Sequence, residues 1–172
     1  MTLACRCAAA LIGCVATTST LAFAAAHEAA PLELMGVHIG QTEEQARHAL
    51  TGHASFDKEV ENQQIWRVLQ DPSMQYVFIG FDREHRVRYV TTVAASSGPP
   101  MACAPLGDPA TAVKKGDARF VEFRREVKQE DETLAIIAKG PSAEHLSRCS
   151  IKKVGGGEEE EEEEQRERSK QR

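Results

Sequence analysis

Histidine and acidic side chains are the residues of this sequence that could hold a metal ion or move a proton. His38, His48 and His53 lie ten and five residues apart, and no H-E-x-x-H or C-x-x-C spacing accompanies them. A zinc site is usually marked by such spacings, because its ligands must converge on one ion. The spacings favour a structural or incidental role for the histidines. A periplasmic enzyme or metal-binding protein that uses His48, His53 and nearby acids is the alternative interpretation.

The sequence also lacks motifs for nucleophilic catalysis and for phosphate binding. No G-x-S-x-G elbow presents a serine nucleophile, and no glycine spacing forms a phosphate loop. Glu122, Glu126, Asp131 and Glu132 could work as a carboxylate pair only if the fold brought two of them to one cleft. Their positions are more typical of the polar side of a hairpin. We therefore predict a protein that is not an enzyme and that binds no metal and no cofactor.

Two cysteines, Cys103 and Cys149, remain once the N-terminal segment described next is removed. An even pair of cysteines in an oxidising compartment is most simply a disulfide. Closing so long a loop would stabilise the fold by roughly 4 kcal/mol in the chain-entropy model. We expect a Cys103–Cys149 bridge rather than a redox pair or a metal pair.

Residues 1–26 are typical of a signal peptide. No charged residue lies between Arg6 and His27, and residues 8–26 are mostly Ala, Leu, Ile, Val and Phe. A charge followed by an apolar run and then by small residues is the pattern that a leader peptidase cleaves. We predict cleavage after Ala24 or Ala26, which would release a periplasmic or secreted protein with no membrane insertion.

Two other interpretations of this segment stay open. Its 19 uncharged residues at 8–26 could nearly cross a hydrocarbon layer of about 30 Å as an uncleaved anchor. The run Leu11-Ile12-Gly13-Cys14 also resembles a bacterial lipobox, in which Cys14 would carry the lipid. In that case the protein would be a lipid-anchored structural protein of the envelope.

Composition limits the number of domains and the class of partner. The 172 residues, less the leader, make a single domain at 27–154 and a Gly/Glu-rich tail at 155–172. The tail holds eight Glu against four Lys or Arg and cannot bury apolar area, so we expect disorder there. Residues 27–157 carry 18 acidic and 16 basic residues, and only nine aromatic residues occur in the chain. These numbers argue against a nucleic-acid partner, which needs a basic stripe and stacking surfaces.

The first half of the domain predicts a helix followed by a meander of strands. Thr42 is a good N-cap, Gln45 completes a capping box, and Gly52 ends a helix of about nine residues. After a polar stretch at 57–64, segments rich in β-formers predict strands at 65–69, 75–82 and 87–94. The strand at 75–82 is apolar on both sides, which predicts a central position with the helix over one face.

A similar order of elements returns after the break at Gly98-Pro99-Pro100. Asp108 as N-cap and Pro109 as first residue predict a second short helix over 109–115. Strands are expected next at 119–127, 134–139 and 148–154. A helix and three strands would thus occur in each half, 32–95 and 103–154, as in an internal duplication. We expect an α+β fold: an antiparallel sheet with one or two short helices packed on one face.

Arginines near aromatic residues indicate where another protein could bind. Arginine and aromatic side chains often dominate the binding energy of protein interfaces. The plain alternative is that these arginines belong to the charged outer side of a sheet. The interface residues that we predict are Trp66, Tyr89, Arg119 and Arg124.

The segment from Ile39 to Gly52 resembles the opening of a group of small exported bacterial modules with the β-lactamase-inhibitor-protein-like fold. Small lipoproteins of outer-membrane protein assembly share this fold, in which a Gly-x-Thr-capped helix precedes an antiparallel sheet. The resemblance covers 14 of the 172 residues and rests on Gly40, Thr42, Gln45 and Gly52. It implies a non-enzymatic domain that binds another protein of the bacterial envelope across its sheet face.

Overall fold

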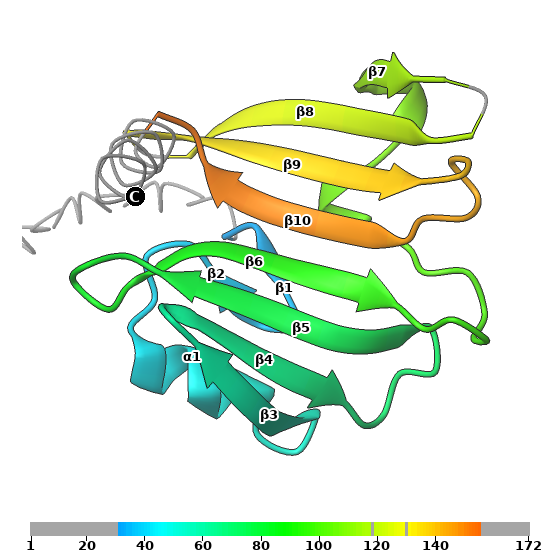
Figure 1. The fold of residues 1–172 in the computed structure, drawn as a ribbon. Helices are drawn as coiled ribbons and strands as arrows, with labels where there is room; N and C mark the ends of the chain where they lie inside the picture. The colour runs from blue at the N-terminus through cyan, green and yellow to red at the C-terminus, as the bar shows by residue number, and fades with distance from the viewer. Residues whose placement is uncertain (1–30, 118, 130, 156–172) are drawn as a thin grey trace, which may run out of the picture.

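One eight-stranded antiparallel sheet, with strand order β3-β4-β5-β6-β10-β9-β8-β7, is the main feature of the computed structural model (Figure 1). The structure describes residues 31–117, 119–129 and 131–155. The signal peptide expected at 1–26, and all of the expected tail except Gly155, lie outside these residues. Within them, no helix is long and apolar enough to cross a membrane.

The sheet is built from two meanders, one from each half of the chain. A short hairpin, β1 (Glu33–Leu34) and β2 (Val37–His38), and the helix α1 (Glu43–Leu50) precede the first meander. The first meander consists of β3 (Ala54–Val60), β4 (Gln63–Val68), β5 (Met74–Phe81) and β6 (Val87–Ala94). Two single 3-10 turns, η1 (Ala104–Leu106) and η2 (Pro109–Thr111), precede the second. The second meander consists of β7 (Val113–Gly116), β8 (Val121–Gln129), β9 (Glu132–Gly140) and β10 (Arg148–Lys153).

One face of the sheet is covered. Residues paired across antiparallel strands point to the same face, so the register places Trp66, Val77, Thr92 and Cys149 together. Helix α1, the β1–β2 hairpin and η1 pack against this face, which we call the covered face (Figure 1). The buried side chains that these elements add to its core are Leu34, Val37, Ala46, Leu50 and Leu106.

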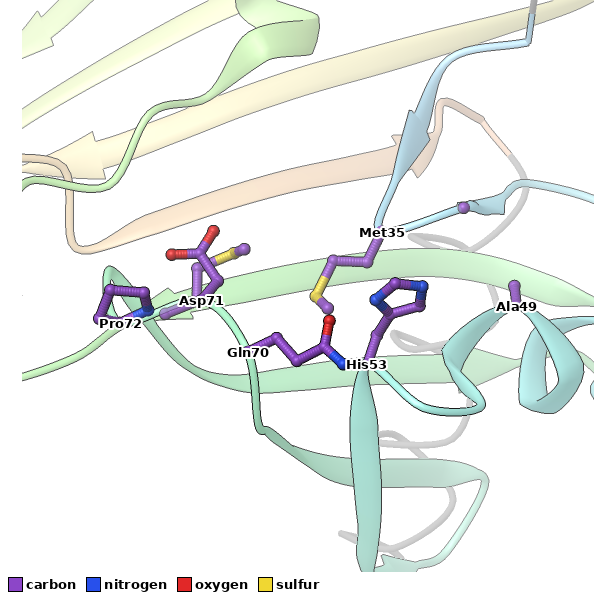
Figure 2. A pocket seen from close by; sticks show the side chains of 8 residues that line it. Met35, Ala49, His53, Gln70, Asp71 and Pro72 are labelled. Carbon is purple, nitrogen blue, oxygen red and sulfur yellow. The ribbon is translucent and has the colours of Figure 1, made fainter.

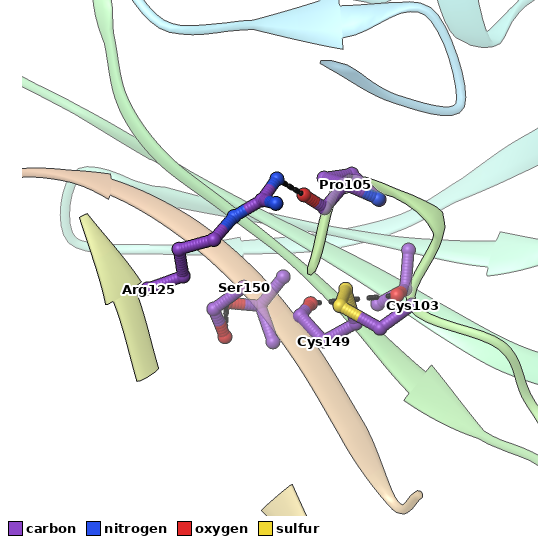
Figure 3. The surroundings of a disulfide bond; sticks show 7 residues. Cys103, Pro105, Arg125, Cys149 and Ser150 are labelled. Atoms are coloured by element: carbon purple, nitrogen blue, oxygen red, sulfur yellow. Dashed lines mark hydrogen bonds between the residues drawn. A yellow bond between two sulfur atoms is a disulfide. The ribbon is translucent and has the colours of Figure 1, made fainter. Parts of the chain in front are cut away.

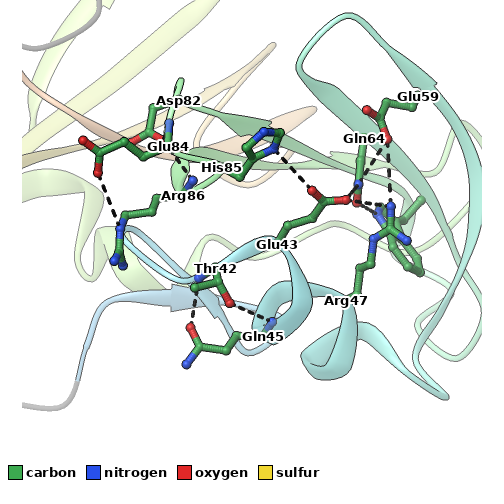
Figure 4. A network of polar contacts seen from close by, with 11 residues as sticks. Thr42, Glu43, Gln45, Arg47, Glu59, Gln64, Asp82, Glu84, His85 and Arg86 are labelled. Atoms are coloured by element: carbon green, nitrogen blue, oxygen red, sulfur yellow. Dashed lines mark hydrogen bonds and ion pairs between the residues drawn. The ribbon is translucent and has the colours of Figure 1, made fainter.

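Helix α1 has the capping box that the sequence predicts. The Thr42 hydroxyl accepts a hydrogen bond from the Gln45 amide at 3.3 Å, and the Gln45 side chain accepts one from the Thr42 amide at 2.9 Å (Figure 4). Two turns of helix are not stable alone, so packing must hold α1 in place. Ala46 and Leu50 supply that packing, since both are fully buried.

A buried glutamine adds polar contacts between α1 and the sheet. Gln64 of β4 is 1% exposed. Its amide nitrogen donates to the carboxylate of Glu43 on α1 at 2.7 Å and to that of Glu59 at 3.2 Å (Figure 4). Its oxygen accepts a hydrogen bond from the Trp66 indole nitrogen at 3.3 Å. Both polar atoms of the amide have partners, which is the condition for burying it without a large penalty.

The connection from β6 to β7 crosses the covered face from the centre of the sheet to its far edge. The expected Cys103–Cys149 disulfide is present and joins this connection to β10, with 5.4 Å between the Cα atoms (Figure 3). The Arg125 guanidinium of β8 donates to the Pro105 carbonyl in η1 at 2.6 Å. The bridge and Arg125 therefore fix the crossing chain to two strands of the second meander, β10 and β8.

The expected antiparallel sheet with a short helix on one face is confirmed, but the fold is richer in strand than expected. The second helix predicted at 109–115 is wrong: η2 is a single turn, and β7 follows it. Asp108 does cap that turn, accepting a hydrogen bond from the Ala110 amide. Pairing of β7 with β8 then replaces further helix, an example of tertiary context overriding a local signal. The described residues thus contain one α-helix, and each half of the chain contributes a four-stranded meander rather than the expected helix and three strands.

The polar stretch at 57–64, which was not predicted as strand, mostly belongs to β3 and β4. Strand β3 is an edge strand, and its side chains from Ser55 to Val60 are exposed. It is held by backbone pairing with β4. An exposed edge strand has no buried side to impose apolar alternation, so the sequence carried no signal for it.

The double substitution Cys103→Ala and Cys149→Ala is expected to lower the free energy of unfolding by about 4 kcal/mol, because the unfolded chain regains the freedom of a long loop. Urea denaturation of wild type and variant, with and without dithiothreitol, measures the effect. Reduction should bring the wild-type midpoint to that of the variant and leave the variant unchanged. A wild-type midpoint that does not respond to reduction would contradict a stabilising bridge.

Candidate functional site

Among the described residues, no element packs on the side of the sheet opposite α1, which we call the open face. Strand alternation and register define the side chains on this face. In the first meander they include Gln63, Ile65, Arg67, Tyr76, Phe78, Tyr89, Thr91 and Val93. In the second they include Glu122, Arg124, Glu126, Ala135, Ile137, Lys139, Arg148, Ser150 and Lys152.

Aromatic and aliphatic side chains gather in the middle of the open face. The rings of Tyr76 and Phe78 on β5 lie 6.2 Å apart and, like Tyr89 on β6, are partly exposed. Ile65 and Ile137 lie on the same face and are only 9% and 8% exposed, so their neighbours on this face shield them from water. Partly exposed aromatic groups around a buried aliphatic floor are typical of protein interfaces.

The ring of Tyr89 is held flat against the sheet. A Cβ at Gly80 would lie 2.0 Å from a ring carbon of Tyr89, so only glycine leaves room for the ring at this position. The Gln63 amide donates a hydrogen bond to the Tyr89 hydroxyl, and the Arg88 guanidinium carbon lies 5.7 Å from the ring centroid. Tyr89 therefore has a fixed orientation and loses little freedom when another molecule binds.

Basic side chains surround this apolar centre. Arg67 lies with its guanidinium carbon 5.8 Å from the Tyr76 ring centroid, and Arg148 is paired with Val93 and exposed. The acidic residues at open-face positions are Glu122 and Glu126, with Asp57 beside Arg67 at the β3 bulge. The basic residues at open-face positions are Lys58, Arg67, Lys115, Arg124, Lys128, Lys139, Arg148 and Lys152. The described open face therefore has a positive charge, although the domain as a whole is acidic.

Two ion pairs order the second-meander part of the open face. Arg124 contacts Glu126 at 3.0 Å, and the Lys139 ammonium contacts Glu122 at 2.8 Å. The hydrogen bond from Lys139 holds the pKa of Glu122 below its ordinary value of about 4.5. Partial burial raises this pKa, whereas the charges of Lys139, Lys115 and Arg124 lower it, and the net direction is down.

The residues predicted as an interface from the sequence do not all share one surface. Tyr89 and Arg124 are both on the open face. Arg119 is exposed in the turn between β7 and β8. Trp66 is on the covered face, 8% exposed and packed edge-on against Phe56, so a partner cannot reach it without opening the core. Trp66 is therefore not part of the candidate interface.

Sequence reasoning missed Tyr76, Phe78, Arg67 and Arg148 as parts of this surface. A signal for the first two was present, because the strand that holds them is apolar on both of its sides. Arg67 and Arg148 had no such signal, since they are 81 positions apart in sequence and meet on one face only through the order of strands.

The histidines of the alternative interpretation lie at separate hollows. His53 lines an open hollow of about 460 Å³ with Met35, Asp71 and Met74 (Figure 2). His48 lies on the exposed side of α1, at a different hollow beside Glu44. Across the part of the chain that the structure describes, no three His, Cys, Asp or Glu residues gather as metal ligands. The described residues therefore give no shared site to His48 and His53.

Comparisons with known proteins add no assignment: no protein-family model matches this chain, and no curated protein or solved structure matches it either. A functional assignment must therefore be based on the chemistry of the open face.

Glu122→Gln is expected to remove a pH-dependent part of the stability. The folded-state pKa of Glu122 is lowered, so its carboxylate stabilises the fold above the ordinary value of about 4.5 and loses this effect as the pH falls through the folded-state pKa. Urea denaturation over a pH series should show wild type more stable than Glu122→Gln near neutral pH and the two converging in acid. The exposed control Glu84→Gln should not show this convergence. A difference between wild type and Glu122→Gln that stays constant with pH would refute the assignment.

Proposed function

We propose that this chain is an exported binding module of the bacterial envelope, which holds an acidic surface of another protein on the open face of its sheet. The observation that carries this proposal is the open face itself, with partly exposed Tyr76, Phe78 and Tyr89 among basic side chains. Such a surface offers apolar burial at its centre and charge complementarity at its rim. The resemblance of residues 39–52 to exported modules that bind proteins across a sheet points to the same function.

Two features favour a protein over a nucleic acid as the partner. Tyr89 lies flat on Gly80 beneath Arg88, so it is not free to insert between bases. The centre of the face is aliphatic as well as aromatic, with Ile65, Val93 and Ile137, which suits protein side chains.

The periplasm, or the outside of the cell, is the proposed location. The Cys103–Cys149 bridge supports an oxidising compartment, where such bonds persist. The apolar N-terminal segment of the sequence supports export to that compartment.

Open-face substitutions test the binding function. The processed protein is immobilised and exposed to envelope extract from its own host, and the retained proteins are quantified by mass spectrometry. Phe78→Ala and Arg148→Glu should each reduce the retained partner by about tenfold or more, since a central aromatic and a basic rim residue are lost. The matched control Arg83→Glu changes an exposed arginine in the β5–β6 turn, away from the open face, and should retain the partner as wild type does.

Equal retention by wild type and by both open-face variants would refute a binding role for this face. The same variants are assayed against single-stranded DNA and RNA oligonucleotides. Binding to oligonucleotides that is lost in Phe78→Ala and Arg148→Glu, without a retained protein, would show a nucleic-acid partner instead.

Mass spectrometry of the mature N-terminus tests the export pathway. We expect a free N-terminus at Ala25 or His27, because the small residues before these positions fit a leader peptidase. A mature chain that begins at a lipid-modified Cys14 would instead show the lipid-anchored structural protein. A polypeptide that keeps Met1 and free thiols throughout would contradict export altogether.

A further inference from the structure

We propose that the run of glutamates at residues 158–164 binds to the open face of its own chain and competes there with the acidic partner. The competition with a partner rests on the proposed function, whereas the contact within the chain does not require a partner. It gives the open face a specific occupant and makes the binding module self-inhibiting.

Charge complementarity is the first argument. Residues 158–164 are seven consecutive glutamates, whereas basic residues exceed acidic ones on the described open face. Arg148 on β10 is exposed and makes no ion pair with any residue that the structure describes. Lys128 on β8 is also exposed on this face. A surface ion pair is weak alone, but several that form together with a linked segment add up.

The point at which the chain leaves the sheet is the second argument. Strand β10 lies between β6 and β9, in the middle of the sheet and not at an edge. The Val154 amide donates to the Thr133 carbonyl at 2.8 Å, so the chain is held at the sheet through Val154, one residue beyond the end of β10. Gly155 has φ +88°, a conformation that glycine adopts readily and that turns the chain out of the strand direction. The glutamates therefore begin three residues beyond a turn that follows the end of a central strand of the sheet.

The reach of the segment is sufficient. Extended chain spans at most about 3.5 Å per residue, so residue 164 can lie about 30 Å from Gly155. The six residues of β10 span about 20 Å. The glutamates can therefore lie along the whole of β10, from Lys152 to Arg148, and reach neighbouring strands. The opposite side of the sheet offers no room, because α1, the β1–β2 hairpin and the β6–β7 connection occupy it.

A short link makes the competition effective. A segment joined by a few residues has an effective concentration in the millimolar range at its own binding site. An acidic partner must displace the glutamate segment, so the apparent affinity of the partner for the open face is lowered. The contact is between charges in water, so salt should weaken it, with a Debye length of about 8 Å at physiological ionic strength.

The first test uses NMR of the processed, full-length protein alone. The tail-neutral variant carries Glu→Gln at each of residues 158–164. At about 20 mM NaCl the ring signals of Tyr76 and Tyr89 and the guanidinium signal of Arg148 should differ between wild type and this variant, and at about 500 mM they should coincide because the charges are screened. The indole signal of Trp66, on the covered face, should not change. The control Glu44→Gln, Glu84→Gln and Glu144→Gln, which neutralises exposed carboxylates elsewhere, should match wild type.

The second test measures competition with a synthetic peptide of the sequence of residues 155–165. The tail-neutral protein should bind this peptide about tenfold more tightly than wild type does, because its own segment no longer occupies the face. Arg148→Glu in the tail-neutral background should remove the gain.

Three results would overturn the proposal: identical open-face signals in wild type and tail-neutral protein, equal changes at Trp66, or changes that grow with protein concentration. The last would show that the segment binds a second copy. The two proposals fail in different ways. If only the proposed function is wrong, the NMR differences between wild type and tail-neutral protein will persist, but the open-face variants will retain the same envelope proteins as wild type. If both proposals hold, the tail-neutral protein should retain more of the partner than wild type.

Discussion

The antiparallel pairing of β6 with β10 is the contact on which the rest of the structure depends. It runs from Tyr89–Lys152 to Val93–Arg148 and joins the last strands of the two meanders. Without this pairing, each meander would have a further unpaired edge and a face half as large. With it, all eight strands contribute side chains to one continuous surface. The aromatic groups come from β5 and β6, and most of the basic groups come from β7 to β10, so neither half alone holds the combination.

The connections between strands make the two faces unequal. Helix α1, the β1–β2 hairpin and the β6–β7 connection all lie on the same side of the sheet. Two of them are fixed there by specific contacts: the Gln64 amide donates a hydrogen bond to Glu43 of α1, and the disulfide joins the crossing chain to β10. Apolar burial on that side stabilises the fold, and the other side is left free to keep partly exposed aromatic residues for binding.

Much of the fold was predictable from local patterns. Three features agree with expectation: the strands of both meanders other than β3 and β7, the capping box of α1, and the pairing of the two mature cysteines. Each of these features is marked by a pattern of residues in the sequence. The errors fall where that signal is weak. Edge strands β3 and β7 have exposed side chains and no apolar alternation, and a capped Asp108-Pro109 start did not continue as helix because β7 pairs with β8. Trp66 was predicted at the surface but is buried. Alternation shows which residues share a side of a strand, but it does not show which of the two sides is covered.

The sequence by itself determined which residues share a side of each strand and where α1 begins. It also determined that Cys103 and Cys149 were the two cysteines of the expected mature chain that could form a disulfide. These are local or compositional properties, encoded by alternation, capping and cysteine number. Only the tertiary structure decided the order of strands, and with it the gathering of Arg67, Arg148 and Lys139 around Tyr76 and Tyr89 on one uncovered face. The reason is physical: strand order depends on long-range pairing and on which side the connections cross, and no single segment of the chain contains either.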